Sequence, residues 1–389
     1  MKRYPLLIMT ILLSFDLIAQ KVNFDYFGLT PPGNIPIKFA SEIISKDGGK
    51  AAFFMYSPDG TEATVCLVEA KQTAYLMTKE NGNWSPPKPA YFIDDDSLVN
   101  YPTFSPDGKY FWFTGGNNAR HGWGDLYVSE KNGQIWGKPI HLPYPVNSER
   151  REGGFSLTMN NTLYFTSGRD DKHNCCSDVY RSRFINGKYS VVERMNNLST
   201  DADEESLFIS PDENYIIVQS WRQEGIGMHD FYIAYRDEND SWTPLILMDT
   251  VINTKDLEVM PVVSPDGKYF FFSRVNVAKR DIDIYWVSTK KIFKPYVYHT
   301  IPDTSIRVNQ FFNFSIPSNT FKDYDSNQLT LSASMINGEK LPGWLIFDAK
   351  NYVFKGVPTK SDTLIIKVTA ADENSNYCSD KFKLIVDSN

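Results

Sequence analysis

Three glutamates and three arginines recur at matching places in this chain of 389 residues and are the first candidates for chemistry. Each glutamate lies six residues before a Ser or Thr that opens a turn, and each arginine ends the next strand: Glu152, Glu204, Glu258, Arg169, Arg222 and Arg274. Paired carboxylates can hydrolyse glycosides, and Arg can hold a carboxylate ligand through two parallel hydrogen bonds. The same residues could instead form ion pairs between adjacent repeats, so a ligand-binding polar funnel and internal pairing both stay open.

Two tryptophans in predicted loops add an aromatic component to this candidate site. Trp123 and Trp221 could stack on a sugar or peptide ring, or could cover their own sheets. The sequence contains no GxSxG, no HExxH and no phosphate-binding loop, and its five histidines are scattered. We therefore favour a non-catalytic binding protein, with a polysaccharide-degrading hydrolase or lyase as the alternative.

A turn motif shows how these residues are positioned. "SPDG" or a close variant recurs with its turn residue at Asp59, Asp107, Asn160, Asp212 and Asp266, at intervals of 48, 53, 52 and 54 residues. A "DxY" strand and then an Asn-Gly-type turn follow in the same order. Asp-Gly and Asn-Gly provide the positive φ angles that hairpin turns need. Each repeat therefore predicts a four-stranded sheet with the "SPDG" stretch as a turn and not as a catalytic centre.

Sheets of this kind must pack around a ring, because one alone buries too little to be stable. The sequence predicts an all-β protein with a β-propeller of five repeats, in which Ile35–Ala40 completes the outer strand of the last blade. Six blades are possible if residues 30–50 and 285–300 form a further sheet. Strand alternation puts the "SPDG" and Asn-Gly turns on one face and the long loops between second and third strands on the other. The long-loop face is the expected binding face.

The "FSPDG…DIY" pattern of residues 27–297 resembles the TolB-type propeller repeat family. The resemblance implies a propeller over residues 21–297. The family includes binding proteins, scaffolds and domains attached to enzymes, so the fold does not identify the function.

Residues 299–389 change to period-two alternation with frequent turns, which predicts a small β-sandwich. The pieces "TFKDYD", "LPGWLIFD", "FKGVPT" and "VTAADENS" resemble the dystroglycan-type cadherin-like domain, an immunoglobulin-like module. That resemblance implies a role in adhesion or spacing. It also implies calcium as the possible cofactor, with Asp323, Asp325 and Asp372 as ligands. The alternative is that these carboxylates are simply solvated.

The N-terminus and the composition indicate where the protein works. Lys2, Arg3, an apolar run and Ala19 predict a signal peptide over residues 1–19, and hence export as a soluble protein to the periplasm or beyond. No later stretch is long and apolar enough for membrane insertion. A net charge of −7 argues against nucleic acid as a partner. We therefore expect an exported binding or scaffold protein whose partner is a glycan or a protein, with the oligomeric state left open.

Overall fold

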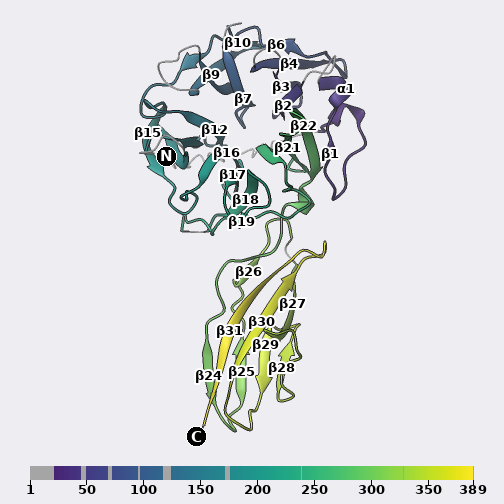
Figure 1. Ribbon diagram of the computed structural model, residues 1–389, viewed down its shortest axis with the longest axis vertical. Helices are drawn as coiled ribbons and strands as arrows, with labels where there is room; N and C mark the ends of the chain where they lie inside the picture. The colour runs from purple at the N-terminus through teal and green to yellow at the C-terminus, as the bar shows by residue number, and fades with distance from the viewer. Residues whose placement is uncertain are drawn as a thin grey trace, which may run out of the picture.

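The computed structural model describes residues 22–44, 50–68, 72–94, 97–116, 124–170, 176–237, 239–326 and 328–388. The predicted signal peptide lies outside these residues. A ring of sheets forms one part of the molecule and an elongated β-sandwich forms the other (Figure 1). The predicted all-β class is confirmed, since strands make up both parts.

The ring contains five sheets, each built on four strands in sequence order apart from the last. The first is β2 (Lys50–Tyr56), β3 (Glu62–Val68), β4 (Gln72–Glu80) and β5 (Asn83–Trp84), with β6 (Lys88–Pro89) beside β4. The second is β7 (Leu98–Phe104), β8 (Tyr110–Gly116), β9 (Asp125–Asn132) and β10 (Ile135–Trp136), with β11 (Ile140–His141) beside β9. The third is β12 (Glu152–Leu157), β13 (Leu163–Ser167), β14 (Asp178–Ile185) and β15 (Lys188–Arg194). The fourth is β16 (Asp203–Ile209), β17 (Tyr215–Trp221), β18 (Asp230–Tyr235) and β19 (Ile246–Leu247).

The fifth sheet takes its outer strand from the start of the chain. β20 (Leu257–Val263), β21 (Tyr269–Asn276) and β22 (Asp281–Ser288) are joined by β1 (Ile37–Lys38), which pairs antiparallel with β22. This confirms that Ile35–Ala40 closes the last blade. Within the described part of the chain the ring therefore has five blades. Of the residues considered for a sixth, 37–38 and 285–288 belong to the fifth blade, and 296–297 pair with a strand of the C-terminal part.

The "SPDG" stretches are hairpin turns, as predicted. In the first blade the Asp59 carboxylate accepts hydrogen bonds from Ser57 Oγ (2.6 Å) and Thr61 N (3.0 Å), and Gly60 has φ +69°. The Ser57 hydroxyl also accepts a bond from Glu62 N at 2.9 Å. Side-chain oxygens thus satisfy the turn's amides, and Gly provides the left-handed backbone.

A short N-terminal segment fastens the first blade to the last. η1 (Tyr26–Gly28) places the buried Tyr26 so that its hydroxyl donates to Asp266 Oδ1 at 2.6 Å, in the turn of the fifth blade. The neighbouring Asp25 accepts a bond from Trp84 Nε1 at 3.2 Å and pairs with Lys79 at 2.8 Å, both in the first blade. The helix α1 (Ser41–Ile44) follows β1 and buries Ile44 in the same core.

The C-terminal part is a β-sandwich. One sheet has the order β24 (Thr304–Arg307), β31 (Tyr377–Asp387), β30 (Asp362–Ala371) and β27 (Thr330–Met335), in which β24 runs parallel to β31. The other is β25 (Phe312–Ser315), β29 (Val353–Gly356) and β28 (Leu345–Asp348). Phe354 and Phe382 pack together in the core between them.

Aromatic packing joins the two parts. η3 (Thr289–Lys291) leads into β23 (Tyr296–Val297), which pairs with β26 (Phe321–Lys322) of the sandwich part. The Tyr296 ring stacks on Tyr235 of the propeller with centroids 3.9 Å apart. Tyr324 packs on Tyr215 and Phe293 at centroid distances of 4.7 and 4.6 Å. The sandwich therefore packs on the fourth blade and on the connection that follows the fifth.

Candidate binding site

The repeated glutamates and arginines form one ion pair in each of three blades. The distances are 3.1 Å for Glu152 with Arg169, 3.3 Å for Glu204 with Arg222, and 2.7 Å for Glu258 with Arg274. Each pair joins the first and second strands of one blade, so the expectation of pairing between adjacent blades is wrong. The reason is register: the glutamate opens the inner strand opposite the end of its hairpin partner.

These pairs also hold the chain that enters each blade. Glu204 accepts bonds from Thr200 N (3.1 Å) and Thr200 Oγ1 (2.7 Å), four residues upstream, and the same arrangement recurs at Ser148 and Thr254. Arg169 donates to the Pro145 and Val146 carbonyls. The recurring sequence "[ST]xxxE" is therefore a clamp on the connection between blades. That spacing is a signal in the sequence that could have identified the clamp.

Burial leaves these residues little contact with a ligand. The three glutamates are fully buried, and the arginine side chains are only 10–16% exposed. Burial raises the pKa of all three glutamates, while their hydrogen bonds and arginines oppose the rise. The guanidinium of Arg222 also lies 4.4 Å from the ring centroid of Tyr232. The arrangement is that of buried, hydrogen-bonded charges within the scaffold.

A different group of polar side chains lies on the long-loop face, and two of its members, Glu205 and Arg151, are partly exposed. Glu205 follows the buried Glu204 and pairs with Arg151 of the third blade at 2.9 Å. Glu205 also accepts a bond from Gln219 Nε2 at 3.1 Å and lies 3.7 Å from His229 Nε2. The pairing of β16 with β17 has an irregular register between Glu204 and Ser206. Because of this bulge the two consecutive glutamates contact different partners: Glu204 pairs with Arg222, and Glu205 pairs with Arg151.

An exposed tryptophan lies beside this group. Trp221 ends β17 with 54% of its surface exposed, and its ring centroid is 6.1 Å from that of His229. We call Trp221, His229, Glu205, Arg151 and Gln219 the rim cluster. Trp123, the other predicted stacking residue, lies outside the described residues. Trp221 was thus predicted as a binding residue of this face, whereas sequence reasoning missed Glu205, Arg151 and Gln219.

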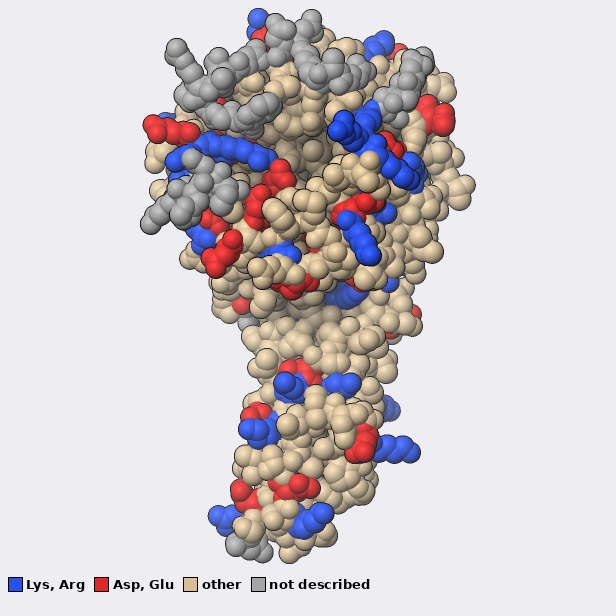
Figure 2. Space-filling view, in the orientation of Figure 1, with Lys and Arg blue, Asp and Glu red and all other residues tan. Residues whose placement is uncertain are grey.

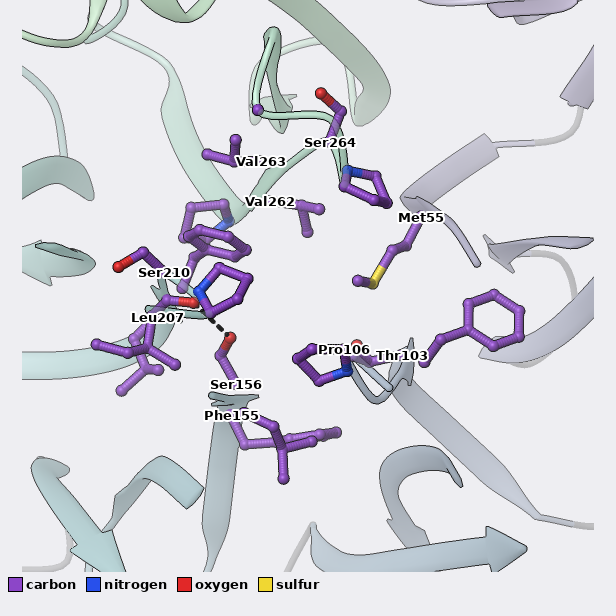
Figure 3. Close-up of a pocket in the computed structure, with 18 of the residues that line it drawn as sticks. Met55, Thr103, Pro106, Phe155, Ser156, Leu207, Ser210, Val262, Val263 and Ser264 are labelled. Atoms are coloured by element: carbon purple, nitrogen blue, oxygen red, sulfur yellow. Dashed lines mark hydrogen bonds between the residues drawn. The ribbon is translucent and has the colours of Figure 1, made fainter. Parts of the chain in front are cut away.

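The centre of the ring contains a cavity of about 500 Å³ that reaches the turn face. Figure 3 shows side chains from all five blades converging on it, among them Met55, Thr103, Phe155, Leu207 and Val262. Prolines of the turns, such as Pro106, and Tyr324 of the sandwich also line it. Its wall is mainly apolar, so this end of the channel offers packing surface and few ion-pairing groups.

Acidic and basic side chains are interspersed over the face of the propeller seen in Figure 2, without one large area of a single sign. This distribution agrees with the modest net charge of −7. It provides no extended field for a polyanion.

The predicted calcium ligands lie near the junction of the two parts. Burial and the neighbouring Asp325 raise the pKa of Asp323 to about 7, and Asp323 Oδ2 is buried with no hydrogen-bond partner in the described structure. That oxygen would suit a hard cation. Asp372 fits less well, since its Oδ1 accepts bonds from Asn374 N and Asn376 N, both at 2.8 Å. Among the described residues no three His, Cys, Asp or Glu side chains are close enough to hold a metal ion.

Comparison with known proteins supports the assignment of the C-terminal part. A family model described as "Putative Ig domain" matches residues 294–387, so the C-terminal resemblance is confirmed as immunoglobulin-like. The cadherin-like subtype stays a prediction. No curated protein matches the chain. No helix among the described residues is long and apolar enough to cross a membrane.

Solved structures match at low identity. The structure of "putative TolB" from Agrobacterium tumefaciens is 19% identical, with 60% of this chain and 72% of that one covered and a TM-score of 0.39. A "putative 6-phosphogluconolactonase" from Bacteroides uniformis is 12% identical, with 86% and 85% covered and a TM-score of 0.36. A "putative alpha-galactosidase" from Bacteroides fragilis is 17% identical, with 24% and 18% covered and a TM-score of 0.19. The chain thus spans less than a fifth of that last protein, and none of these likenesses bears on function.

Proposed function

We propose that this protein is a non-catalytic binding protein that recognises a glycan or a protein segment through the rim cluster on the long-loop face of its propeller. The observation that carries the proposal is the exposed Trp221 ring beside hydrogen-bonding side chains. An aromatic face can stack on a sugar ring, while the partly exposed Glu205 and Arg151 offer an acceptor and donors to hydroxyl groups. This combination favours a glycan over a protein segment.

The catalytic alternative has less support. Glu152, Glu204 and Glu258 are fully buried and each is bound by its own arginine. A glycosidase needs two carboxyl groups that reach the scissile bond from opposite sides. These three glutamates do not offer such a pair at the surface.

A glycan array probed with the full chain and with Trp221→Ala tests the proposal. We expect saturable binding to at least one glycan class, weakened tenfold or more by Trp221→Ala, because aromatic anchors dominate such contacts. Tyr377→Ala is the control, since Tyr377 is exposed on the sandwich, far along the chain from the rim cluster. Unchanged affinity for Trp221→Ala would contradict the rim assignment. Release of shorter sugars would instead identify an enzyme.

The same proposal includes export and the role of the second part. The immunoglobulin-like part would act in adhesion or as a spacer, and the chain would be exported after cleavage near Gln20 or Lys21. Mass spectrometry of the protein recovered from the producing cell tests this. Intact Met1 in the exported fraction would contradict the predicted cleavage.

A further inference from the structure

The larger sheet of the β-sandwich carries basic side chains on its outer face. Along β30 and β31 alternate side chains are buried in the core, and those between them point away from it. Lys367 of β30 and Lys381 and Lys383 of β31 belong to the outward set, and the two on β31 are exposed. We call these three residues the lysine face. They lie on the sandwich, whereas the rim cluster lies on the propeller.

The register of the sheet brings two of these positive charges together. Lys367 is the direct cross-strand partner of Lys381, so their Cβ atoms lie about 5 Å apart on the same side of the sheet. Lys383 follows two residues after Lys381, about 7 Å further along the same side of the strand. Like charges directly opposite each other destabilise a sheet. An anion bound between the lysines would relieve this repulsion.

The protein's own acidic side chains do not balance these charges. Among the residues that the structure describes, no side chain of the lysine face has an ion-pair or hydrogen-bond partner. Asp303 binds the backbone of Lys383, whose N–H donates to Asp303 Oδ1 at 2.7 Å. Asp387, the acidic member of the outward set of β31, lies in register with Arg307 of β24. The three lysines are therefore available to an external anion.

Hydroxyl groups lie beside the lysines on the same face. Thr369 and Ser379 form the next outward cross-strand pair, and their hydroxyl oxygens are 2.9 Å apart. Ser332 and Ser334 of β27 lie opposite Thr369 and Lys367. Serine and threonine hydroxyls both donate and accept hydrogen bonds, as sugar hydroxyls do. The face thus combines positive charge with groups suited to a sugar.

The place of the lysine face in its sheet restricts the kind of anion. β30 and β31 are the two inner strands, so their backbone groups already pair on both sides. An acidic peptide laid over them would find no backbone partner for its own amides. Basic segments that bind membranes cluster about four to eight lysines or arginines, more than this face offers. An acidic sugar polymer needs neither.

We propose that the lysine face binds a polyuronate, an acidic polysaccharide with a carboxylate on each sugar unit. The carboxylates pair with Lys367, Lys381 and Lys383, and the sugar hydroxyls bond to Thr369 and Ser379. Neighbouring units can each meet a separate lysine, because the three ammonium groups are spread across two strands and along one of them. Exposed ion pairs are individually weak, so several must act together. This inference goes beyond glycan binding at the rim cluster and does not depend on it.

Calorimetric titration of the full chain with an oligogalacturonate at low salt tests the lysine face. We expect saturable binding that weakens as salt is added, because exposed charges are screened. Lys381→Gln should lower the affinity about twofold, and Lys367→Gln, Lys381→Gln and Lys383→Gln combined should lower it about tenfold. The triple variant should melt at no lower temperature than the unmodified chain, because it removes the repulsion between Lys367 and Lys381.

Lys355→Gln is the matched control. Lys355 lies on the other sheet of the sandwich and pairs with Asp348 at 3.7 Å, so its loss should leave the affinity for oligogalacturonate unchanged. Trp221→Ala should also bind as the unmodified chain does. Absence of saturable binding, affinity that does not change with salt, or equal affinity in the triple variant overturns the proposal.

Four further outcomes would assign the binding elsewhere and also overturn the proposal. Loss of binding in Trp221→Ala but not in the triple lysine variant would place the oligogalacturonate at the rim cluster. Binding of oligoglutamate at least as tight as that of oligogalacturonate would indicate an acidic protein segment. Binding of a sulfated glycan, or of vesicles that contain anionic lipid, without binding of oligogalacturonate would identify those as the partner.

Discussion

Asp266 should contribute more to stability than the equivalent residues of the other turns, because it also closes the ring. Its Oδ1 accepts bonds from Ser264 Oγ (2.8 Å) and Lys268 N (3.2 Å), and additionally from Tyr26 OH at 2.6 Å. Asp107 of the second blade has the first two kinds of bond, from Ser105 Oγ (2.6 Å) and Lys109 N (3.1 Å), but no Tyr26 equivalent. Asp107→Ala is therefore a matched control.

The size of the difference follows from the burial of Tyr26. Loss of the turn bonds alone should cost about 1 kcal/mol in either blade. Asp266→Ala also removes a bond to a charged acceptor and leaves the buried Tyr26 hydroxyl without that partner, which adds about 2 kcal/mol. We expect a loss of about 3 kcal/mol for Asp266→Ala against about 1 kcal/mol for Asp107→Ala.

Urea unfolding of both variants and of Tyr26→Phe measures these differences. The double variant Tyr26→Phe with Asp266→Ala should show a coupling energy of about 1–2 kcal/mol. Although burial alone would raise it, bonds from Tyr26, Lys268 and Ser264 hold the pKa of Asp266 below its ordinary value of 3.8. The coupling should therefore persist at neutral pH and be lost as the pH falls below about 4. Equal losses for the two alanine variants, or no coupling, would refute this account of ring closure.

Three further predictions concern the buried pairs and the junction. Arg222→Ala should lower the free energy of unfolding by about 3–5 kcal/mol, since it leaves the buried Glu204 without its partner charge. Arg151→Ala should cost about 1 kcal/mol or less, because the side chains of Arg151 and Glu205 are 42% and 29% exposed; urea titration compares the two variants. Because the pKa of Asp323 is raised, the folded chain holds a proton there that the unfolded chain releases. The melting temperature of the sandwich should therefore fall as the pH rises from about 5 to about 8. Asp323→Asn should make the melting temperature less dependent on pH over this range. Calcium at pH 8 should raise that melting temperature in the unmodified chain and not in Asp323→Asn; identical melting with calcium and with chelator would exclude the ion.

Sequence reasoning predicted the parts of this fold that local chemistry determines. A turn such as Ser57–Gly60 is specified by four adjacent side chains, so its conformation can be predicted without knowledge of the rest of the ring. The closing strand was also predictable. The last repeat lacks an outer strand, and the segment Ile35–Ala40, which precedes the first repeat, is available to provide one. The β-sandwich was predictable from its period-two alternation, and its immunoglobulin-like character from the resemblance of four sequence pieces to a known module.

The candidate sites depend on contacts that a single repeat does not encode. Glu204 and Glu205 are adjacent in sequence, yet a bulge sends one into the scaffold and the other to the rim cluster. Glu204 was predicted as a site residue because equivalent glutamates recur in other repeats. Recurrence is also expected of a residue that holds the connection into each blade. Glu205, which binds Arg151 of another blade, has no repeated pattern and was missed. A cavity between the second and third blades could not be predicted either, because its aromatic walls come from separate repeats.

The pairing of β1 with β22 also sets an order of events during synthesis. Ile37 emerges among the first residues of the propeller but has no partner until Trp286 has been made. Until then β22 is missing and the early segment cannot dock, so the ring cannot close while the chain is still growing through its blades. Contacts between residues so distant in sequence slow folding. Once β22 has formed, its outer edge stays open to other strands until β1 arrives, and the period most prone to aggregation should follow the completion of translation of the fifth blade.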